Sequence, residues 1–401
     1  MKKTFIITIL TLLTIIPIRY IKASDEPIIK EFSSLGKTPI TISLYEGGTQ
    51  EDIDKIQDIY DYYSQLTSSF LRNEVDDSHK YYNLNNVYLI NEKAGIEPVV
   101  VDKTLYDLLK QAIVISEKTN GYFNPAIGRA IDIWKEVIER YRFSEITKEV
   151  YDETIQKLEA LNPVDLSKII FNDEDLSVYL MDDTLKIDLG AYAKGYATEK
   201  VVEYIKSVGI KKYMVDAGKS NIAVGQHPDN RPFGIAIGDP LELYKLNVVG
   251  FVRVNDKHVV TSGNELQFVT YQGKRYHHIL SPKDYMPKHY YTSIVLIGDD
   301  AGLLDAYSTA LYSMDESSVE TFLNDTDIKY VLYTDKGDIK GNTTNKIFEK
   351  STLITPKTSN KTGFFLIIGG VVLLFGSMAT YMFIKERQKQ SKEVVNEEDP
   401  Q

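Results

Sequence analysis

The sequence of 401 residues has no cysteine, a single tryptophan and six histidines. Without cysteine the chain can form no disulfide, no zinc–thiolate site and no thiol nucleophile. A lipoprotein anchor is also excluded, because that modification needs a cysteine at the mature N-terminus. Positive charge is in deficit, with 46 Lys and Arg against 57 Asp and Glu and a formal net charge of −11. Nucleic-acid-binding proteins normally present a basic face, so this composition argues against that class.

The remaining composition is that of a globular protein, with 43% hydrophobic and 26% charged residues. The length suffices for one large domain or two medium ones with a substantial core. Helical and strand patterns alternate without an obvious repeat, so we expect an α+β fold. The patterns predict strands at 39–45, 185–189, 212–217, 248–254, 258–262, 266–271, 291–297 and 329–334, and helices at 102–119, 190–207 and 301–314.

The N-terminus has the features of a secretory signal. Lys2 and Lys3 precede a short apolar run, and small residues follow near Ala23. This order of charge, apolar stretch and small residues predicts a signal peptide over 1–24, with an uncleaved membrane anchor as the alternative.

A second hydrophobic segment, Phe364–Ile384, has 21 residues without a charge. A helix of that length matches the hydrocarbon core of a bilayer, about 30 Å thick. Lysines and an arginine follow at once, and such clusters stay cytoplasmic. We therefore expect a flexible stalk at 346–361, a transmembrane helix at 362–384 and a cytoplasmic tail at 385–401. The folded domain would then lie on the outer side of the cell membrane.

Two segments have residues suited to a ring or an anion. Tyr122, Phe123 and Asn124 lie in a glycine-flanked turn that could bracket a flat ring, although a packed turn after a helix explains the pattern equally well. Asp188 precedes a predicted helix start, where free N–H groups favour a phosphate, and Lys194 adds a cation. A capped helix with an exposed lysine is the plainer reading of this second segment.

Two further segments have residues suited to a proton or a metal ion. His277 and His278 alternate along a predicted strand, so only one of them can face a given site. Asp305 and Thr309 are four residues apart on a predicted helix and can turn their oxygens towards one Mg²⁺ ion. A structural histidine and an aspartate at a helix N-terminus are the simpler interpretations.

The order and spacing of these segments resemble the ApbE-type flavin transferases. The resemblance covers roughly residues 35–340 and rests on five stretches: Gly121–Pro125, Asp188–Gly195, Thr261–Asn264, Tyr276–Ile279 and Asp305–Leu311. It implies one large ApbE-type, T-fold-like domain at 31–345, with mixed or antiparallel sheets and flanking helices. It also implies FAD as the substrate and Mg²⁺ as the cofactor.

The family resemblance implies a role for each matching position. His278 would be the general base, assisted by Lys194. Mg²⁺ would be held by the carbonyl oxygen of Ala191 and the side chains of Asp305 and Thr309. The residues expected to contact FAD are Tyr81, Tyr122, Phe123, Asn124, Asp188, Lys194 and Ile279.

The implied reaction transfers FMN from FAD to a threonine or serine hydroxyl of an exported or membrane-anchored acceptor protein, such as an electron carrier, and releases AMP. Three positions depart from the family pattern, which has aspartate and Thr-Gly where this chain has Ser281, Asp284 and Tyr285. Two alternatives stay open: an FAD pyrophosphatase that uses water as the acceptor, and a flavin-binding membrane protein without turnover. Covalent FMN on this chain itself is not expected, because no segment resembles the small-residue acceptor motif.

Overall fold

The computed structural model describes residues 26–70, 78–240, 248–344 and 346–351, and within them the fold is α+β. The largest sheet has eight strands, and every neighbouring pair is antiparallel. Its spatial order is β1 (Ile28–Ser34), β2 (Thr38–Leu44), β6 (Tyr213–Ala217), β7 (Asn221–Val224), β10 (Lys257–Gly263), β13 (Tyr291–Gly298), β14 (Lys329–Thr334) and β15 (Ile339–Gly341).

Both faces of this sheet are covered. Strand β13 is buried at every position, and its side chains alternate between two hydrophobic cores because strand side chains have a period of two. Ile294 and Leu296 join the larger core, whereas Val295 and Ile297 join the smaller one. The smaller core lies against a three-stranded sheet of β8 (Phe233–Gly238), β9 (Val248–Val254) and β16 (Phe348–Lys350).

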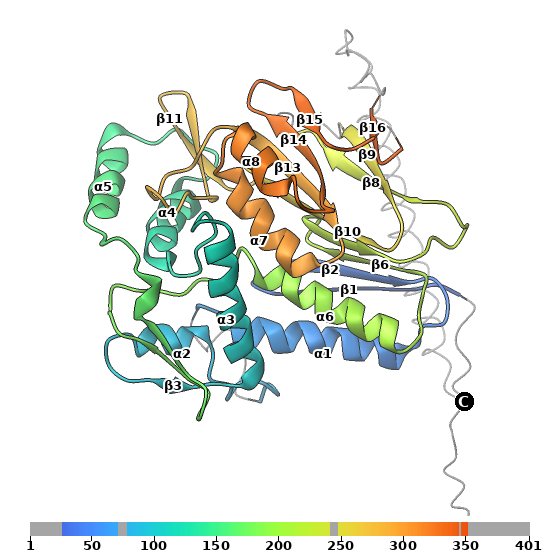
Figure 1. The fold of residues 1–401 in the computed structure, drawn as a ribbon, viewed down its shortest axis with the longest axis horizontal. Helices are drawn as coiled ribbons and strands as arrows, with labels where there is room; N and C mark the ends of the chain where they lie inside the picture. Colours follow the sequence, from blue (N-terminus) through green and yellow to red (C-terminus); the bar gives the residue numbers. More distant parts are fainter. Residues whose placement is uncertain (1–25, 71–77, 241–247, 345, 352–401) are drawn as a thin grey trace, which may run out of the picture. The chain divides into compact units, whose positions relative to one another are not determined.

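Helices cover the other face of the sheet. They are α1 (Gln50–Thr67), α6 (Ala193–Ser207) and α7 (Ala301–Tyr312), and α6 packs against both of the others. Figure 1 shows α1 and α6 running side by side along the sheet. Helix α1 begins with a capping box between Thr49 and Asp52, which satisfies N–H groups that a helix start leaves free. The Tyr60 hydroxyl on α1 lies 2.9 Å from the Thr198 hydroxyl on α6.

The remaining elements form a second region beside these helices (Figure 1). Its helices are α2 (Val87–Glu92), α3 (Lys103–Lys118), α4 (Gly128–Tyr141) and α5 (Lys148–Glu159), with a 3₁₀ turn at Leu166–Lys168. Helix α8 (Glu316–Leu323) instead follows α7, and its Phe322 ring meets that of Tyr307 on α7 at 5.0 Å. Two small sheets complete the fold: β3 (Val99–Val100), β5 (Ser177–Leu180) and β4 (Ile169–Asn172) in one, β11 (Phe268–Tyr271) and β12 (Lys274–His277) in the other.

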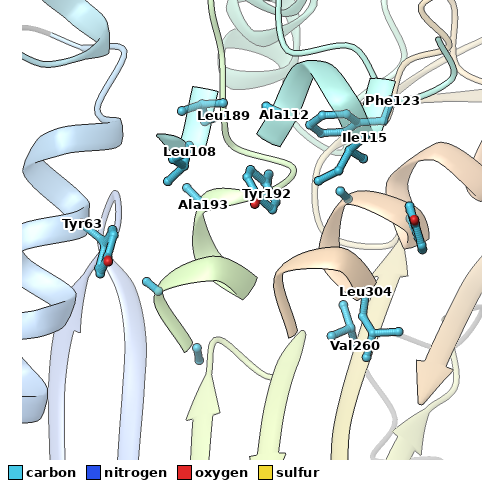
Figure 2. Close-up of a cluster of buried hydrophobic side chains, with 14 of the residues drawn as sticks. Tyr63, Leu108, Ala112, Ile115, Phe123, Leu189, Tyr192, Ala193, Val260 and Leu304 are labelled. Carbon is cyan, nitrogen blue, oxygen red and sulfur yellow. The ribbon is translucent and has the colours of Figure 1, made fainter. Parts of the chain in front are cut away.

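The larger core joins the two regions. Figure 2 shows Leu108, Ala112 and Ile115 of α3 directed towards Tyr192 and Leu189, close to where α6 begins. Tyr192 is fully buried, and its ring meets that of Phe123 edge to face at 6.1 Å. The start of α6 is therefore fixed by packing from a helix about eighty residues earlier in the chain.

Most of the predicted elements are confirmed. The helix expected at 102–119 is α3, with Asp102 accepting a hydrogen bond from the Thr104 N–H as its N-cap. The helix expected at 190–207 is α6, and Gly209 just beyond it has a positive φ of +82°. The helix expected at 301–314 is α7, and the strands predicted around it are all present except the one at 185–189.

The strand predicted at 185–189 is wrong. The segment is extended and largely buried, but it makes only one isolated bridge, between Lys186 and Ile127. On one side its backbone bonds to the turn at 125–128, through the Gly128 N–H to the Lys186 carbonyl and the Asp188 N–H to the Pro125 carbonyl. On the other side a side chain takes the place of a strand: Asn91 accepts from the Ile187 N–H at 2.7 Å and donates to the Ile187 carbonyl at 2.8 Å. A buried apolar run identifies burial but not the partner of its backbone.

The predicted boundary of the stalk also needs correction. Residues 348–350 were expected within the stalk, but they form β16 and pair with β9. Phe348 is 8% exposed and lies over Gly250, where any larger side chain would collide with its ring. The folded unit therefore extends to Lys350.

The predicted signal peptide, the transmembrane helix at 362–384 and the tail lie outside the described residues. Among the residues that are described, no helix combines the length and apolar character needed to cross a bilayer.

Candidate active site

The loop before α6 is ordered by hydrogen bonds to one of its own side chains, Asp188. The Asp188 carboxylate accepts hydrogen bonds from the Gly190 N–H at 2.8 Å and from the Ser69 hydroxyl at 3.2 Å. Helix α6 follows with Tyr192 as N-cap, and Tyr192 offers no side-chain hydrogen bond to the first turn. The Ala193 N–H donates to the Leu189 carbonyl at 2.8 Å, and the Gly195 N–H is bonded as well, so it is mainly the positive end of the helix dipole that favours a ligand anion here.

Asp305 on α7 lies at this helix start and is only 4% exposed. Its Oδ2 accepts from the Gly195 N–H at 2.8 Å, and its Oδ1 lies 3.4 Å from the Lys194 ammonium. The contact is possible because residue 195 is glycine: a Cβ there would lie 2.6 Å from the Asp305 Cβ and 2.2 Å from the Ala301 carbonyl oxygen. The structure thus brings together Lys194 and Asp305, which lie 111 residues apart in sequence.

Asn221, at the start of β7, is a site residue that the sequence analysis did not assign. Its amide donates to the Asp305 Oδ1 at 3.1 Å, while its own Oδ1 is buried without a hydrogen-bond partner among the described residues. The signal in the sequence was weak, since Asn221 ends the turn Gly218–Asn221 that the family pattern matches only in part. An unpaired buried oxygen beside a carboxylate is suited to a cation or to a ligand donor.

Further polar side chains follow Asp305 along α7. The Ser308 hydroxyl lies 2.7 Å from that of Ser262 on β10 and donates to the Asp305 carbonyl at 3.0 Å. Thr309, one turn after Asp305, is half-buried on the same helix. Ala191 lies two residues before α6 begins and is partly exposed.

These oxygen atoms suit a Mg²⁺ ion that completes its coordination shell with ligand and water, and not a metal ion that is coordinated by protein side chains alone. The described residues contain no group of three or more His, Asp or Glu side chains placed to hold one ion. Asp305, Thr309 and Asn221 offer hard oxygen atoms, and Mg²⁺ usually takes one or two carboxylates and completes its shell with phosphate and water. The donor set therefore fits a Mg²⁺ ion that binds together with a phosphate ligand.

A cavity of about 190 Å³ opens beside the α6 start. Asp188, Gly190 and Lys194 form one wall, and residues from the β1–β2 turn and from the end of α1 form the others. The β1–β2 turn includes Leu35, which has a positive φ of +48°, an uncommon conformation for a leucine. The cavity is lined by Leu35, Gly36, Thr38, Ser64, Gln65, Thr67, Ser68, Ser69, Phe70, Asn86, Asp188, Leu189, Gly190, Ala193 and Lys194.

The turn at Tyr122–Asn124 divides its residues between core and surface. Phe123 is 3% exposed in the larger core, so its ring has no free face for a flavin. Tyr122 is half-buried, with the Lys283 ammonium 5.1 Å from its ring centre. Asn124 lines a separate cavity of about 540 Å³ with Lys283 and Tyr285. Tyr122 and Asn124 thus remain accessible, whereas Phe123 supports the turn from inside.

His277 and His278 differ in burial, but strand β12 ends at His277, so His278 follows the strand instead of alternating within it. His277 is fully buried, and its Nε2 lies 3.0 Å from the Lys288 carbonyl oxygen. His278 is exposed to solvent, yet protein atoms surround it closely enough that desolvation lowers its pKa to about 4, with the charges of Lys194 and Arg142 adding to the shift. The ring therefore stays neutral at physiological pH.

The other two predicted flavin contacts lie apart from this arrangement. Ile279 is 5% exposed and belongs to the larger core, so its side chain is not open to a ligand. Tyr81 donates to Asp58 on α1 at 2.7 Å, and its ring packs against that of Tyr62 at 5.2 Å. Tyr81 does not line the 190 Å³ cavity beside α6.

The fold and the site together define a class of protein: an α+β domain in which a helix start and a lysine border a cavity and a nearly buried carboxylate contacts both of them. This combination is suited to holding a phosphate ester with a divalent cation.

Comparison with known proteins agrees with this description of the fold. The profile of the ApbE family matches residues 37–332, and the chain belongs to this family. The chain is 30% identical over 232 residues to the FAD:protein FMN transferase of Treponema pallidum, which covers 56% of this chain and 63% of that protein. It is 25% identical over 320 residues to the enzyme of the same name from Klebsiella pneumoniae, covering 79% and 92%.

A solved structure of an ApbE protein from Thermotoga maritima superposes with a TM-score of 0.66 at 26% identity, covering 81% of this chain and all of that one. The flavin transferase ApbE from Vibrio cholerae superposes with a TM-score of 0.62 at 19% identity, which bears on the fold alone.

Proposed function

We propose that this chain is an FAD:protein FMN transferase, which transfers FMN from FAD to a threonine or serine hydroxyl of another protein and releases AMP. The observation that carries the proposal is the contact of Asp305 with Lys194 and with the start of α6, beside the cavity that Asp188 and Lys194 line. Relatives that cover most of the domain bear the name of this enzyme, and the fold agrees with theirs.

The pyrophosphate of FAD would bind at the α6 start. The positive end of the α6 dipole and the Lys194 ammonium would offset its negative charge, while Asp188 orders the preceding loop by accepting from the Gly190 N–H. Asp188, a carboxylate, is placed to accept from a hydroxyl or amide of the ligand rather than to contact phosphate.

His278 would accept the proton of the attacking hydroxyl. Its lowered pKa keeps the ring neutral, so it can take a proton at physiological pH, and its exposed position allows a hydroxyl from another protein to approach. The hydroxyl oxygen forms a bond to the flavin-side phosphorus, the bond from that phosphorus to the bridging oxygen breaks, and AMP leaves with the bridging oxygen. Bound Mg²⁺, held by Asp305 and Thr309 with the Ala191 carbonyl, would supply charge stabilisation on the phosphate oxygens.

The departures from the family pattern preserve the local turn. The Ser281 hydroxyl accepts from the Lys283 N–H at 3.3 Å, a capping bond that an aspartate would also make. Tyr285 has φ of +58° at the position where the family pattern has glycine, and its carbonyl accepts from the Trp134 indole at 2.9 Å. Asp284 forms an ion pair with Lys288. These contacts support a working turn rather than a site that has lost its activity.

The proposal extends to location. An exported domain held by the segment at 362–384 would meet acceptor proteins at the outer surface of the cell membrane. The apolar stretch Phe364–Ile384 and the cations after it support this arrangement. Protease added to intact cells should digest the folded domain and leave a C-terminal tag protected; a protected domain would contradict the placement.

The activity is tested by incubating the full-length chain with FAD and Mg²⁺, with and without membrane-surface proteins from a strain that lacks this chain. Release of AMP together with flavin that stays covalently attached to protein is the expected result. AMP with only free FMN would indicate the pyrophosphatase, and FAD binding without AMP would indicate a binding protein. Mass spectrometry of the labelled peptides then identifies the acceptor.

Two variants test the roles of the site residues. Asp305→Ala should abolish Mg²⁺-dependent AMP release, and full activity would contradict the metal assignment. His278→Ala should impair transfer far more than FAD binding, because the ring contributes to proton removal. An equal loss of both would instead indicate that His278 shapes the pocket.

A further inference from the structure

Helices α6 and α7 are tied together at two levels, one turn apart. At the upper level the Gly195 N–H donates to Asp305, and at the lower level the Ala301 N–H donates to the Glu199 Oε2 at 2.8 Å. Gly195 and Glu199 are four residues apart on α6, as are Ala301 and Asp305 on α7, so each pair shares one helix face. The two contacts together set both the height and the rotation of α7 relative to α6.

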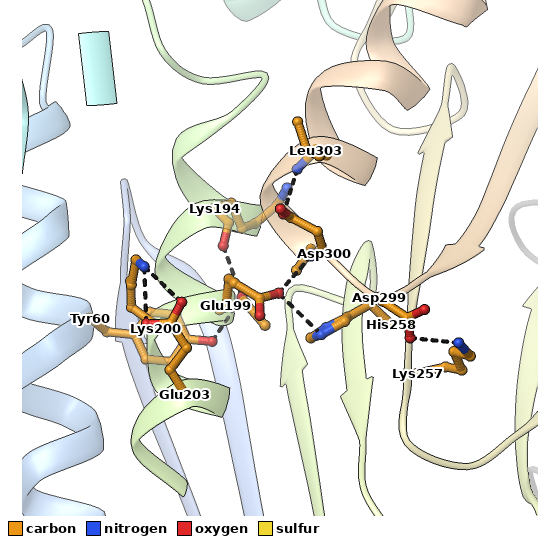
Figure 3. A network of polar contacts seen from close by, with 12 residues as sticks. Tyr60, Lys194, Glu199, Lys200, Glu203, Lys257, His258, Asp299, Asp300 and Leu303 are labelled. Atoms are coloured by element: carbon orange, nitrogen blue, oxygen red, sulfur yellow. Dashed lines mark hydrogen bonds and ion pairs between the residues drawn. The ribbon is translucent and has the colours of Figure 1, made fainter. Parts of the chain in front are cut away.

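Glu199 is itself held from the sheet below. The His258 Nε2 on β10 lies 3.2 Å from the same Glu199 oxygen that binds Ala301. Figure 3 shows this arrangement, with Glu199 lying between His258 and the first turn of α7. Both side chains are largely buried, at 4% exposed for His258 and 18% for Glu199. The carboxylate therefore connects α6, α7 and the central sheet.

This contact is not the ordinary cap of α7. Asp300 is the N-cap residue, and its side chain already accepts from the Leu303 N–H at 2.9 Å. Glu199 binds a different N–H group and comes from another helix. Its role is therefore to connect the two helices rather than to start one of them.

The pair is costly to bury, which makes a purely stabilising role a poor explanation. Desolvation raises the pKa of Glu199, and the His258 Nδ1 has no hydrogen-bond partner among the described residues. Well-packed apolar residues often stabilise a buried position equally well or better, but they do not fix the orientation of one helix relative to another as a hydrogen bond does.

Resting on the proposed function, we infer that Glu199 is a positioning residue that sets the height and rotation of α7 and thereby holds Asp305 where Mg²⁺ binds. Loss of the Glu199 side chain removes the lower of the two hydrogen bonds between α6 and α7. The Asp305 carboxylate then keeps its chemistry but loses its fixed geometry. The affinity for Mg²⁺ falls, whereas the reaction at saturating Mg²⁺ is largely retained.

The test compares Glu199→Ala, Glu199→Gln and Glu199→Asp with a matched control, Glu203→Ala, in the full-length chain. Glu203 lies one turn further along α6 and pairs only with Lys200 at the surface. Glu199→Ala should raise the Mg²⁺ concentration for half-maximal AMP release about 10- to 100-fold, as removal of outer-shell partners commonly does. The maximal rate should change by less than about threefold. Glu199→Gln keeps an oxygen for the Ala301 N–H and should restore most of the affinity.

Glu199→Asp decides the question if Glu199→Ala fails to fold, because it keeps the charge but is too short to reach both partners. It should show the same rise in Mg²⁺ requirement. A second readout is the rise in melting temperature that Mg²⁺ causes in the FAD-bound protein. That rise should need more Mg²⁺ in Glu199→Asp than in Glu203→Ala.

A Mg²⁺ requirement in Glu199→Ala or Glu199→Asp equal to that in Glu203→Ala, by either readout, would overturn the inference. If the unmodified chain binds Mg²⁺ but releases no AMP, the proposed function fails, while the melting-temperature comparison still decides the role of Glu199.

Discussion

Replacing Gly195 with alanine sets two physical effects against each other. Alanine is the better helix former, so propensity alone predicts that Gly195→Ala stabilises α6 by about 1 kcal/mol. The contact with α7 predicts the reverse, because the new Cβ would lie 2.2 Å from the Ala301 carbonyl oxygen and 2.6 Å from the Asp305 Cβ. Real Cβ atoms do not approach other atoms below 3.0 Å, so the helices must separate by close to an ångström.

The contact should win. Overpacking of this kind costs about 1–3 kcal/mol. Separation also stretches the 2.8 Å hydrogen bond from the Gly195 N–H to Asp305. A hydrogen bond to a charged group contributes about 1.5–3 kcal/mol. After the gain in helix propensity is subtracted, we expect a net loss of about 2–4 kcal/mol in the free energy of unfolding.

Urea unfolding followed by tryptophan fluorescence measures this change, because Trp134 is the only tryptophan and is 1% exposed. Glu203→Ala is the control: it lies on the same helix, its side chain is 53% exposed, and its effect should stay within about 0.5 kcal/mol. Gly195→Ala should also lower Mg²⁺-dependent AMP release. A variant as stable as the parent would refute the reasoning that α6 and α7 meet backbone to backbone at this point.

Three further predictions follow from the same contacts. Because the pKa of His278 is lowered to about 4, the rate of FMN transfer, followed as AMP release, should decrease only below about pH 5. A decrease centred near pH 6.5 in the pH–rate profile would contradict this prediction. Desolvation lowers the pKa of His258 to about 4 and that of His277 to about 3. In the unfolded chain these histidines bind protons near pH 6.5, so the free energy of unfolding should decrease as the pH falls from 6.5 towards 4, by on the order of 2 kcal/mol per histidine. Urea unfolding at pH 7 and at pH 4.5 measures this change, and equal free energies at the two pH values would contradict the prediction. Asn221→Ala removes the amide that donates to Asp305 and should raise the Mg²⁺ requirement about tenfold, whereas an unchanged requirement would show that the amide has no part in the metal site.

The sequence predicts local structure well where the pattern and the cap residues agree. Asp102 before an apolar periodic run, with Gly121 beyond it, identifies α3. The segment at 185–189 shows the limit, because its apolar run indicates burial, yet its backbone bonds to a turn at 125–128 and to the Asn91 side chain from α2 instead of to neighbouring strands. Residues 348–350 show a second limit. Their polar surroundings suggested a stalk, and only the position of Gly250 on β9 makes room for Phe348.

The candidate site is likewise divided between what sequence and structure provide. Lys194, Asp188, His278 and Asp305 were found from segment order and from resemblance to a family, and the structure brings Lys194 and Asp305 into contact. Phe123 was expected at the ligand, but its ring is buried, because a turn that packs against Tyr192 must direct one of its aromatic residues inward.

The sequence by itself determined the family, the α+β pattern and the chemical character of the site residues. The family follows from the resemblance of several motifs in a fixed order, whereas the α+β pattern and the chemical character of the residues follow from periodicity and residue type, which are local properties of the chain. Only the tertiary structure decided that Glu199, Asn221 and His258 surround the same helix contact. They come from different elements, and no local pattern records that a glycine on one helix lets a carboxylate on another approach its backbone.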